Sequence, residues 1–371
     1  MSNVLLFSAA LVYLVRLAYF WRGQWRSGRA LPLYNESVPR VTVVVPARNE
    51  ERLIASCIES LVASDYPSSH LEIIVVNDRS TDATAKIIDE LARLHTCVRA
   101  LHRQEADARE NLRGKPGALQ FGIDHASGEI ILITDADCSV HPLWVRTMVA
   151  PFTDPSVEMT AGLTVVRPSS TFARIQDIEW VYTSSMAQAA NSNGHPLGCF
   201  GNNIAIRSSA FAELGGYRGI PFSVTEDLAL MQAIHGRHGS IVFLCEPTGQ
   251  VVTEPCSTVS DYLRQKQRWV QGGLGLGWRG FTFIGSSVVY WVGLVSSIVM
   301  GSLPWTALFL ALRLVGDGVL ITTTAIRMRR WYLLWMGAPV LILLLLLELM
   351  LPLLAMQRRV VWKGQTFVPK P

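Results

Sequence analysis

The sequence predicts an α/β domain with a parallel sheet, attached to a membrane by apolar segments near both of its ends. Apolar, β-branched runs alternate with helical patterns between about residues 39 and 256, and this alternation is typical of a parallel sheet with right-handed crossovers. The chain of 371 residues is 50% hydrophobic and only 17% charged, against about 25% charged in an average soluble domain. Two aspartates follow one apolar run, at the edge where such sheets bind ligands.

The hydrophobic pattern of this domain, residues 39–256, assigns its elements in order. Short β-branched runs predict buried strands, and longer stretches with helical spacing predict helices. The expected elements are strands over 41–46, 71–76 and 129–134, and helices over 51–63, about 81–94 and 117–125. A proline at position 46 ends the first strand.

The N-terminal segment, residues 1–21, reads as an uncleaved membrane anchor. Val4 to Trp21 is charge-free apart from Arg16 and just long enough to span a bilayer. No basic region precedes it and no small-residue cleavage site follows it, unlike a secretory signal. Arginines then recur in a basic linker, 22–38. The positive-inside rule therefore predicts an external N-terminus and a cytoplasmic domain in an integral membrane protein of a bacterial inner or plasma membrane.

The C-terminal third also predicts membrane helices. An amphipathic, interfacial segment (257–280) leads to three apolar stretches within 281–356, namely 281–300, 303 to about 320, and 331–356. Three spans would leave the basic tail, 357–371, outside, against the charge rule. Either one stretch lies in the interface or the rule is violated. Arg313 and Asp317, four residues apart in the second stretch, either pair on one helix face or reach toward the interfaces.

Charge and cysteine content narrow the class of protein. The net charge of +4 fits a membrane surface, and no basic stripe with interleaved aromatics predicts a nucleic-acid partner. The six cysteines are scattered without a C-x-x-C pair, which argues against zinc and disulfides and agrees with a reducing cytoplasm.

The most informative motif is the pair Asp135 and Asp137, which closes the apolar run over 129–134. Carboxylate oxygens at the end of a buried strand suit Mg²⁺ or Mn²⁺ bridging a diphosphate. Two aspartates in a surface turn are the commoner explanation of such a pair alone, so the interpretation depends on the other motifs.

Polar clusters follow the first two predicted strands and precede a helix. Arg48-Asn49-Glu50 comes after the first strand. Asp78 stands at the edge of the second strand and could accept hydrogen bonds from a base or ribose. The following Ser80 or Thr81 is expected to cap the next helix, with Asp82 in its first turn. Lys115 lies in a Gly-Lys-Pro-Gly turn before a helix, where it meets a phosphate or is simply solvated.

Two further motifs come later in the chain. Thr225-Glu226-Asp227 precedes an apolar helical pattern; Thr225 capping the helix explains it as well as a cleft carboxylate does. Gln265, Arg268 and Trp269 share one face of a helix. That face could offer a guanidinium to diphosphate oxygens and a flat ring to a sugar, or could lie on the membrane surface. The glycine-rich stretch 272–277 follows a helix rather than a strand, so we interpret it as a flexible hinge and not as a dinucleotide loop.

Taken together, these motifs resemble the family 2 glycosyltransferases, in particular the membrane-bound branch that includes ceramide glucosyltransferases, cellulose synthase and hyaluronan synthase. The resemblance covers about residues 41–269 and consists of an ordered set of short motifs. These are Val45-Pro46-Ala47-Arg48-Asn49-Glu50, Asn77-Asp78, Gly114-Lys115, Asp135-Ala136-Asp137, Thr225-Glu226-Asp227 and Gln265-x-x-Arg268-Trp269. The resemblance implies a GT-A fold, with a mixed, mainly parallel sheet flanked by helices. It also implies a nucleotide-diphosphate sugar donor, Mg²⁺ or Mn²⁺, and single displacement with inversion at the anomeric carbon.

On the donor side, the resemblance implies that Asp78 and the loop Arg48–Glu50 hold the nucleoside, with Lys115 near the base or the phosphates. Asn77 stands where many relatives carry a second aspartate, so the nucleoside contact rests on Asp78. Asp137, helped by Asp135, binds the metal that neutralises the leaving diphosphate.

For the reaction itself, the resemblance implies that Asp227 is the general base, with Glu226 as its rival. Arg268 stabilises the leaving group, Gln265 contributes to the donor side, and Trp269 shapes the acceptor side. Asn202 and Asn203, which follow Gly201, are expected near the acceptor.

Three functions fit these motifs. The first is transfer of one sugar, from a UDP-sugar, to a membrane-lipid hydroxyl at the cytoplasmic face. The second is a processive polysaccharide synthase of the cellulose, hyaluronan or poly-N-acetylglucosamine kind, whose polymer channel generally needs more membrane helices. The third is a receptor that binds nucleotide sugars without turnover. We favour the first, which makes the bilayer and a lipid acceptor the expected partners.

Overall fold

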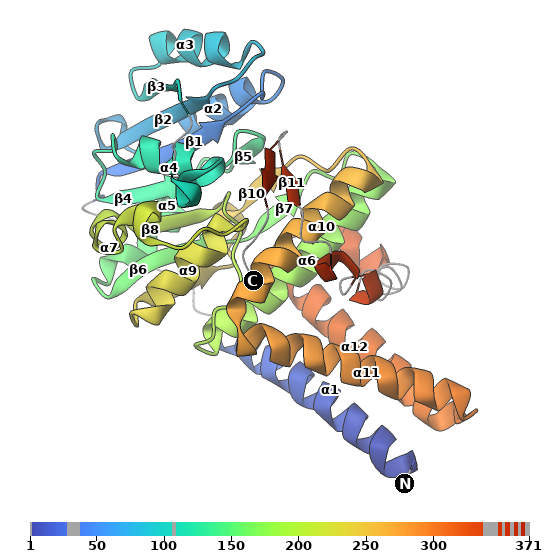
Figure 1. The fold of residues 1–371 in the computed structure, drawn as a ribbon. Helices are drawn as coiled ribbons and strands as arrows, with labels where there is room; N and C mark the ends of the chain where they lie inside the picture. The colour runs from blue at the N-terminus through green and yellow to red at the C-terminus, as the bar shows by residue number, and fades with distance from the viewer. Residues whose placement is uncertain are drawn as a thin grey trace.

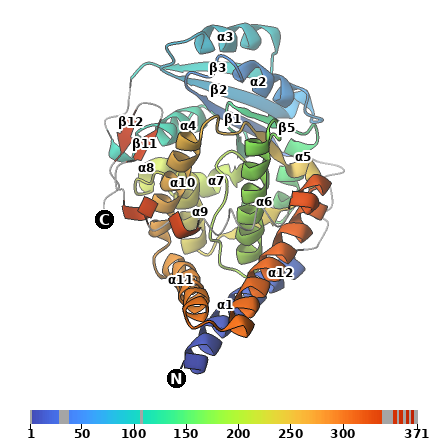
Figure 2. The same ribbon diagram turned by 90° about the vertical axis from the view of Figure 1, so that its right-hand side faces the viewer.

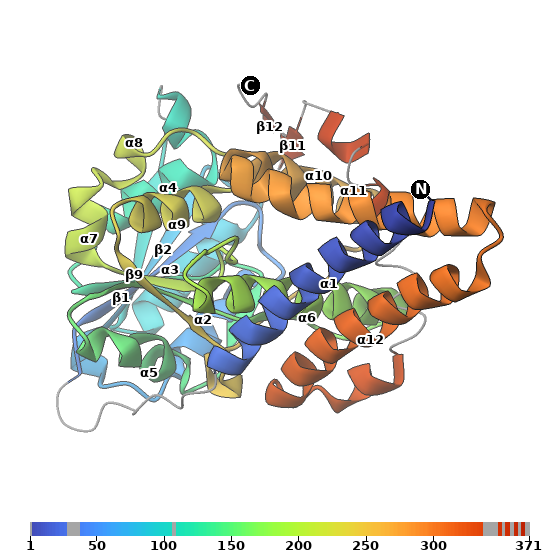
Figure 3. The same ribbon diagram turned by 90° about the horizontal axis from the view of Figure 1, so that it is seen from below.

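The computed structural model describes residues 2–27, 38–105, 109–336, 348–350, 353–356, 360–362 and 365–367. An α/β domain forms one end of the molecule, and three long helices, α1, α11 and α12, extend away from it (Figures 1 and 3). The N-terminus lies at the far end of these helices.

A seven-stranded mixed sheet with the order β3-β2-β1-β4-β8-β6-β9 forms the centre of the domain. β3, β2, β1 and β4 run parallel, β8 is antiparallel to both of its neighbours, and β6 and β9 are parallel. The strands are β1 Val41–Ala47, β2 Leu71–Asp78, β3 Val98–Arg103, β4 Ile130–Ile133, β6 Val157–Gly162, β8 Ile204–Arg207 and β9 Ser240–Leu244. The expected mixed, mainly parallel sheet is confirmed.

Helices cover both faces of this sheet, and a small sheet with the order β5-β10-β7 stands beside it. The small sheet consists of β5 Cys138–Val140, β7 Thr164–Val166 and β10 Val251–Thr253. The α-helices are α2 Ile54–Val62, α3 Thr84–Leu94, α4 Lys115–Ile123, α5 Trp144–Val149, α6 Thr171–Ser192, α7 Ser208–Glu213, α8 Gly216–Gly219, α9 Glu226–Gly236 and α10 Val259–Gly273. Short 3₁₀ turns are η1 Ser68–His70, η2 Glu110–Leu112, η3 Ala150–Thr153, η4 Pro247–Gly249, η5 Leu274–Leu276 and η6 Trp331–Met336.

Successive side chains of the central strands enter two different cores. In β1, Val43 and Val45 pack into the core shared with α2, α3 and α5, whereas Val44 packs into the core shared with α4, α6 and α9. Both faces of the strand are therefore buried, which explains why it reads as an unbroken apolar run.

The ends of the central strands place the polar motifs at one edge of the sheet. In the parallel pairing, Ala47 lies opposite Asn77, and Val44 lies opposite Ile133. The residues that follow β1, β2 and β4 therefore emerge side by side. This shared edge is where open α/β sheets bind ligands.

The strands and helices predicted within residues 39–256 all form, but the start of α3 corrects one expectation. α3 begins at Thr84, three residues after Thr81, and its N-cap position carries no side-chain bond. Ser80 Oγ instead accepts a hydrogen bond from the Asn49 amide at 3.0 Å, and the Thr81 amide donates to Asn49 Oδ1 at 2.8 Å. These two residues fasten the loop after β1 to the loop after β2, rather than capping a helix.

Within the described part of the chain, three helices are long and apolar enough to cross a membrane. They are α1 Ser2–Arg26, α11 Trp278–Val299 and α12 Leu303–Arg327, so the anchor and the first two C-terminal stretches are helical as expected. The third stretch begins as η6, but residues 337–347 lie outside the described residues, as do 28–37 of the linker and much of the tail. A short hairpin, β11 Val360–Trp362 and β12 Gln365–Phe367, stands in that tail.

Arg313 and Asp317 pair on one face of α12, as one of our two expectations states, with Nε 2.8 Å from Oδ2. Both side chains are buried. Tyr13 of α1 donates to Asp317 at 3.0 Å, and Glu348 lies 2.7 Å from Arg313. The charges therefore satisfy one another between helices, as buried ion pairs must in an apolar medium.

Candidate active site

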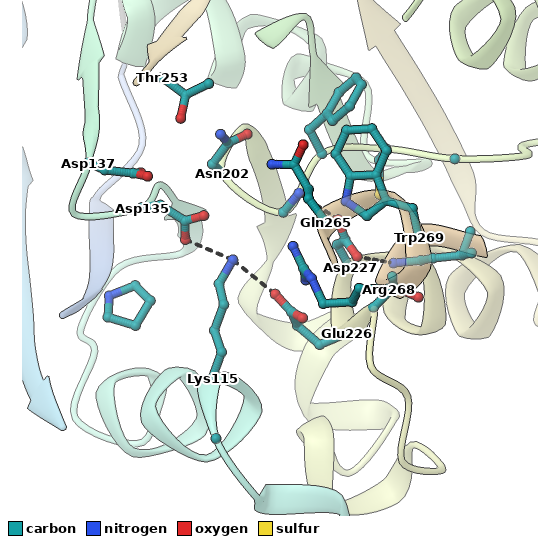
Figure 4. A pocket seen from close by; sticks show the side chains of 18 of the residues that line it. Lys115, Asp135, Asp137, Asn202, Glu226, Asp227, Thr253, Gln265, Arg268 and Trp269 are labelled. Atoms are coloured by element: carbon teal, nitrogen blue, oxygen red, sulfur yellow. Dashed lines mark hydrogen bonds and ion pairs between the residues drawn. The ribbon is translucent and has the colours of Figure 1, made fainter. Parts of the chain in front are cut away.

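A cavity of about 360 Å³ opens at the strand-end edge of the sheet, a size within the usual range for small-molecule sites. Figure 4 shows the polar side chains that converge on it. Every candidate site residue predicted above except Asn203 lines it. They are Arg48, Glu50, Asp78, Lys115, Asp135, Asp137, Asn202, Glu226, Asp227, Gln265, Arg268 and Trp269.

The loop after β1 has a backbone conformation that is fixed by its neighbour. Asn49 has a φ of 55°, a left-handed conformation that asparagine tolerates better than most residues. The Glu50 amide donates to Thr84 Oγ1 at 2.8 Å. Arg48 and Glu50 are thereby held at the rim of the cavity.

Asp78 reaches the cavity already paired with two arginines. Its Oδ1 lies 3.0 Å from Arg79 Nε and 3.2 Å from Arg103 Nη1. The sequence did not point to Arg103, because the sheet register that brings the end of β3 beside Asp78 is a long-range feature. Asp78 therefore lines the cavity with its carboxylate paired to two guanidinium groups.

Lys115 joins the two acidic motifs of the site. Gly114, with a φ of 71°, turns the chain into α4; this left-handed conformation favours glycine. Lys115 Nζ then lies 2.7 Å from Asp135 Oδ1 and 2.9 Å from Glu226 Oε1 (Figure 4). Burial alone would lower its pKa, but these two carboxylates raise the pKa of Lys115 well above its usual range. The lysine is therefore a fixed positive charge at the centre of the cavity.

Asp135 and Asp137 suit a divalent cation that also binds a diphosphate. Both line the cavity beyond the end of β4, and Figure 4 shows their carboxylates near one another. No group of three or more histidine, cysteine or acidic side chains among the described residues could hold a metal by itself. Proteins usually hold Mg²⁺ with one or two carboxylates, and phosphate oxygens and water complete its coordination. The residues therefore fit a metal that arrives with, or is completed by, its ligand.

Asp227 stands in the first turn of α9, and backbone amides hold its carboxylate. Its Oδ1 accepts from the Leu228 amide at 2.8 Å, and its Oδ2 accepts from the Gly201 amide at 2.7 Å. Burial, followed by repulsion from Glu226, raises the pKa of Asp227 to about 6. Lys115, the Leu228 amide and Arg268 oppose that rise. A carboxylate with this pKa is ionised at neutral pH yet is a stronger base than an ordinary aspartate.

Glu226 is buried, and its carboxylate forms an ion pair with Lys115. Thr225 occupies the N-cap position without capping the helix through its side chain. Of the two explanations of this motif, the capping one is therefore met in position but not in a side-chain hydrogen bond. Its hydroxyl instead lies 3.2 Å from Ser223 Oγ.

The face of α10 that carries Gln265, Arg268 and Trp269 lines the cavity, as the helical spacing predicts. Arg268 Nη1 donates to the Val224 carbonyl at 3.3 Å, and Gln265 Oε1 is buried without a protein partner among the described residues. Gly272 belongs to α10. A Cβ there would lie 1.9 Å from Thr225 Oγ1, so this glycine lets α10 approach the residues before α9.

An aromatic cluster, Trp180, Phe200 and Trp269, forms the opposite wall of the cavity. Trp180 stacks on Phe200 with ring centroids 4.6 Å apart, and Trp269 meets Trp180 edge-on at 5.0 Å. Lys266, ion-paired with Glu179, lies 3.8 Å from the Trp269 ring centre. No motif in the sequence indicates Trp180, which lies in the middle of the long helix α6.

The two asparagines expected near the acceptor lie in different places. Asn202 lines the cavity and accepts from Thr164 Oγ1 at 2.8 Å. Asn203 is fully buried, and its amide donates to the Leu163 and Gly249 carbonyls and accepts from Trp144. This corrects the expectation for Asn203, because both polar atoms of its side chain are engaged in the protein interior.

Comparison with known families agrees with this geometry. The family model described as Glycosyl transferase family group 2 matches residues 130–357, more than half of the chain. The chain belongs to glycosyl transferase family group 2. A further model, Glycosyl transferase family 2, matches residues 42–215 of this family member.

The curated relatives of this family 2 chain are named for several different activities. Probable glycosyltransferase YdaM of Bacillus subtilis is 28% identical over 73% of this chain and 66% of its own length. Beta-monoglucosyldiacylglycerol synthase of Synechocystis is 28% identical over 63% and 48%. Poly-beta-1,6-N-acetyl-D-glucosamine synthase of Staphylococcus epidermidis is 26% identical over 64% and 56%. The chain thus spans between about half and two thirds of the length of these relatives.

Among solved structures, the chain is similar to the mannosyltransferase PcManGT from Pyrobaculum calidifontis, in complex with GDP-Man and Mn²⁺. The TM-score is 0.63 at 22% identity, over 88% of this chain and 99% of that one. At this identity the likeness concerns the fold. The family 2 chain therefore has the expected GT-A fold, with apolar helices of spanning length near both ends.

Proposed function

We propose that this chain moves one sugar from a nucleotide-diphosphate donor, a UDP-sugar, to a hydroxyl group of a membrane lipid at the cytoplasmic face. The observation that carries the proposal is the single cavity in which Asp135, Asp137 and Asp227 lie between the strand ends and helices that lead to the membrane. The wall with the acidic side chains binds the sugar donor, and the aromatic wall opposite it contacts the apolar acceptor.

The connection of α6 and α10 to the apolar helices supports a lipid as the acceptor. Both helices line the cavity, and they run alongside one another above the apolar helices (Figure 2). α10 passes through η5 into α11, and α6 packs against α1 and α12. We infer that the hydroxyl of a lipid at the bilayer surface reaches Asp227 between α6 and α10. The relative named beta-monoglucosyldiacylglycerol synthase agrees with such an acceptor.

On the donor wall, the two carboxylates Asp135 and Asp137 would hold Mg²⁺ or Mn²⁺, which would supply positive charge to the diphosphate of the sugar donor. Asp78 and the Arg48–Glu50 loop contact the nucleoside. The buried side-chain oxygen of Gln265 accepts a hydrogen bond from the sugar donor. Lys115 adds a positive charge beside the phosphates.

In the transfer step, the acceptor oxygen attacks the anomeric carbon, and the bond from that carbon to the diphosphate oxygen breaks with its electron pair remaining on the diphosphate. Asp227 takes the hydroxyl proton. The Arg268 guanidinium stabilises the charge of the leaving diphosphate. A single displacement of this kind inverts the anomeric centre.

The proposal is tested with membranes that contain the protein, a host lipid extract and a panel of labelled UDP-sugars, with GDP-mannose included. Metal-dependent label in the organic phase is the expected result and identifies the donor. Label in a polymer would instead favour a polysaccharide synthase. Donor binding without transfer to any acceptor would favour a receptor.

A further inference from the structure

Gly201 lies close against the proposed base. Its amide donates to Asp227 Oδ2 at 2.7 Å. A Cβ at Gly201 would lie 3.0 Å from Asp227 Cβ and 3.1 Å from Oδ2, which is tighter than ordinary contacts allow. The backbone of Gly201 is not in the left-handed region. A side chain at this position would therefore press on Asp227, whereas the backbone conformation does not itself require glycine.

Neighbouring side chains fix the position of this amide. Asn203 is tied to Leu163, Gly249 and Trp144, and its own amide donates to the Phe200 carbonyl at 2.8 Å. On the other side, Phe200 stacks on Trp180. The segment around Gly201 is thus held by four separate parts of the domain.

We propose that the Gly201 amide is a positioning group for Asp227, clamped in place by Asn203, and that it aims the carboxylate at the acceptor hydroxyl. This inference rests on the proposed function and assigns a role to the buried Asn203, which contacts no substrate. With Leu228 on Oδ1 and Gly201 on Oδ2, the carboxylate cannot rotate without losing a hydrogen bond. An N–H donor also favours the charged form of a carboxylate.

The first test compares Gly201→Ala with Gly236→Ala. This control lies at the far end of α9, the helix that carries Asp227, and a Cβ there meets nothing within 4 Å. We expect kcat of the Gly201 variant to fall about 10²-fold, the cost of a misplaced catalytic group, with the donor KM little changed. The control should match the wild-type protein.

The pH profile separates positioning from general damage. Asp227 must be ionised to act as a base, so wild-type activity is present above a pH of about 6 and is lost as the pH falls through that value. Weakening the Gly201 contact raises the pKa of Asp227 further, so the acid limb should move to higher pH. A Gly201→Ala enzyme with wild-type kcat and an unmoved acid limb would overturn the proposal.

A second measurement does not depend on the Gly201 variant folding. Labelling with ¹³C-carbonyl phenylalanine and ¹⁵N-glycine selects Gly122 and Gly201, the glycines that follow a phenylalanine. We expect the Gly201 amide proton to shift with a midpoint near pH 6, the pKa to which burial raises Asp227. Gly122, buried against Val44 and Val76, serves as the reference.

In Asp227→Asn the Gly201 titration should disappear. A Gly201 amide that does not respond to pH in the wild-type protein would contradict the inference. If no donor supports transfer, the proposed function fails, while this titration still reports on the Gly201–Asp227 contact.

Discussion

The two walls of the cavity differ in their chemistry and in the way in which the chain builds them. The wall at the strand ends is charged and is centred on Lys115, Asp135 and Asp137. The wall formed by α6, α10 and the segment before β8 is aromatic, with Trp180, Phe200 and Trp269. Asp227 lies between them. A charged wall suits a diphosphate and its metal, whereas an aromatic wall suits the acceptor, and the proposed base lies where the two would meet.

The largest effect on the charged wall is expected from Asp137→Asn. Loss of a metal ligand should lower kcat/KM about 10²- to 10³-fold, because a bound metal supplies several kcal/mol of charge stabilisation. The metal concentration for half-maximal activity should rise, and the acceptor KM should not. The exposed Asp65→Asn is the matched control. Unchanged metal dependence in the Asp137 variant would remove this residue from the metal site.

Lys115→Met tests whether the centre of the charged wall also governs the base. Without the lysine, Asp135 and Glu226 lose their shared partner, and we expect activity to fall about tenfold to 10²-fold, a range similar to that of lost supporting contacts at metal sites. Lys115 lowers the pKa of Asp227, so the acid limb should move to higher pH.

Lys266→Met is the control for this change, because Lys266 is a buried lysine paired with Glu179 in the aromatic wall. It should leave the acid limb in place. An equal movement of the limb in both variants would show that the effect is not specific to the charged wall.

The smallest effect is expected on the aromatic wall, from Trp180→Leu. Leucine keeps an apolar surface but removes the stacking on Phe200, so the acceptor KM should rise about fivefold to tenfold, in line with the worth of an aromatic pair. The donor KM should stay the same, as measured by initial rates with either substrate varied. A raised donor KM with an unchanged acceptor KM would reverse the assignment of the two walls.

The same contrast explains what the sequence could predict. The charged wall follows the ends of buried strands, so a pattern of β-branched runs and the polar residues after them located Arg48, Asp78 and Asp135. The face of α10 followed from helical spacing. These signals are local, and the predictions of the fold class and of most of the cavity lining depend on them.

The sequence did not reveal residues whose position depends on contacts between distant parts of the chain. Trp180 and Arg103 join the site through packing and strand register. Ser80 and Thr81 read as helix caps, but hydrogen bonds with Asn49 determine their place. Asn203 shares a motif with a cavity residue and yet is turned into the interior.

The central claim is that Asp227 is the base, and the most direct test compares Asp227→Asn with Glu226→Gln. Donor binding and lipid glycosylation should be measured on the same membrane preparations. We expect Asp227→Asn to bind the donor normally and to lose transfer by about 10²- to 10⁴-fold, the usual worth of a general base. Glu226→Gln should retain more activity than Asp227→Asn. Transfer at the wild-type rate by Asp227→Asn, or a larger loss in Glu226→Gln, would contradict this account.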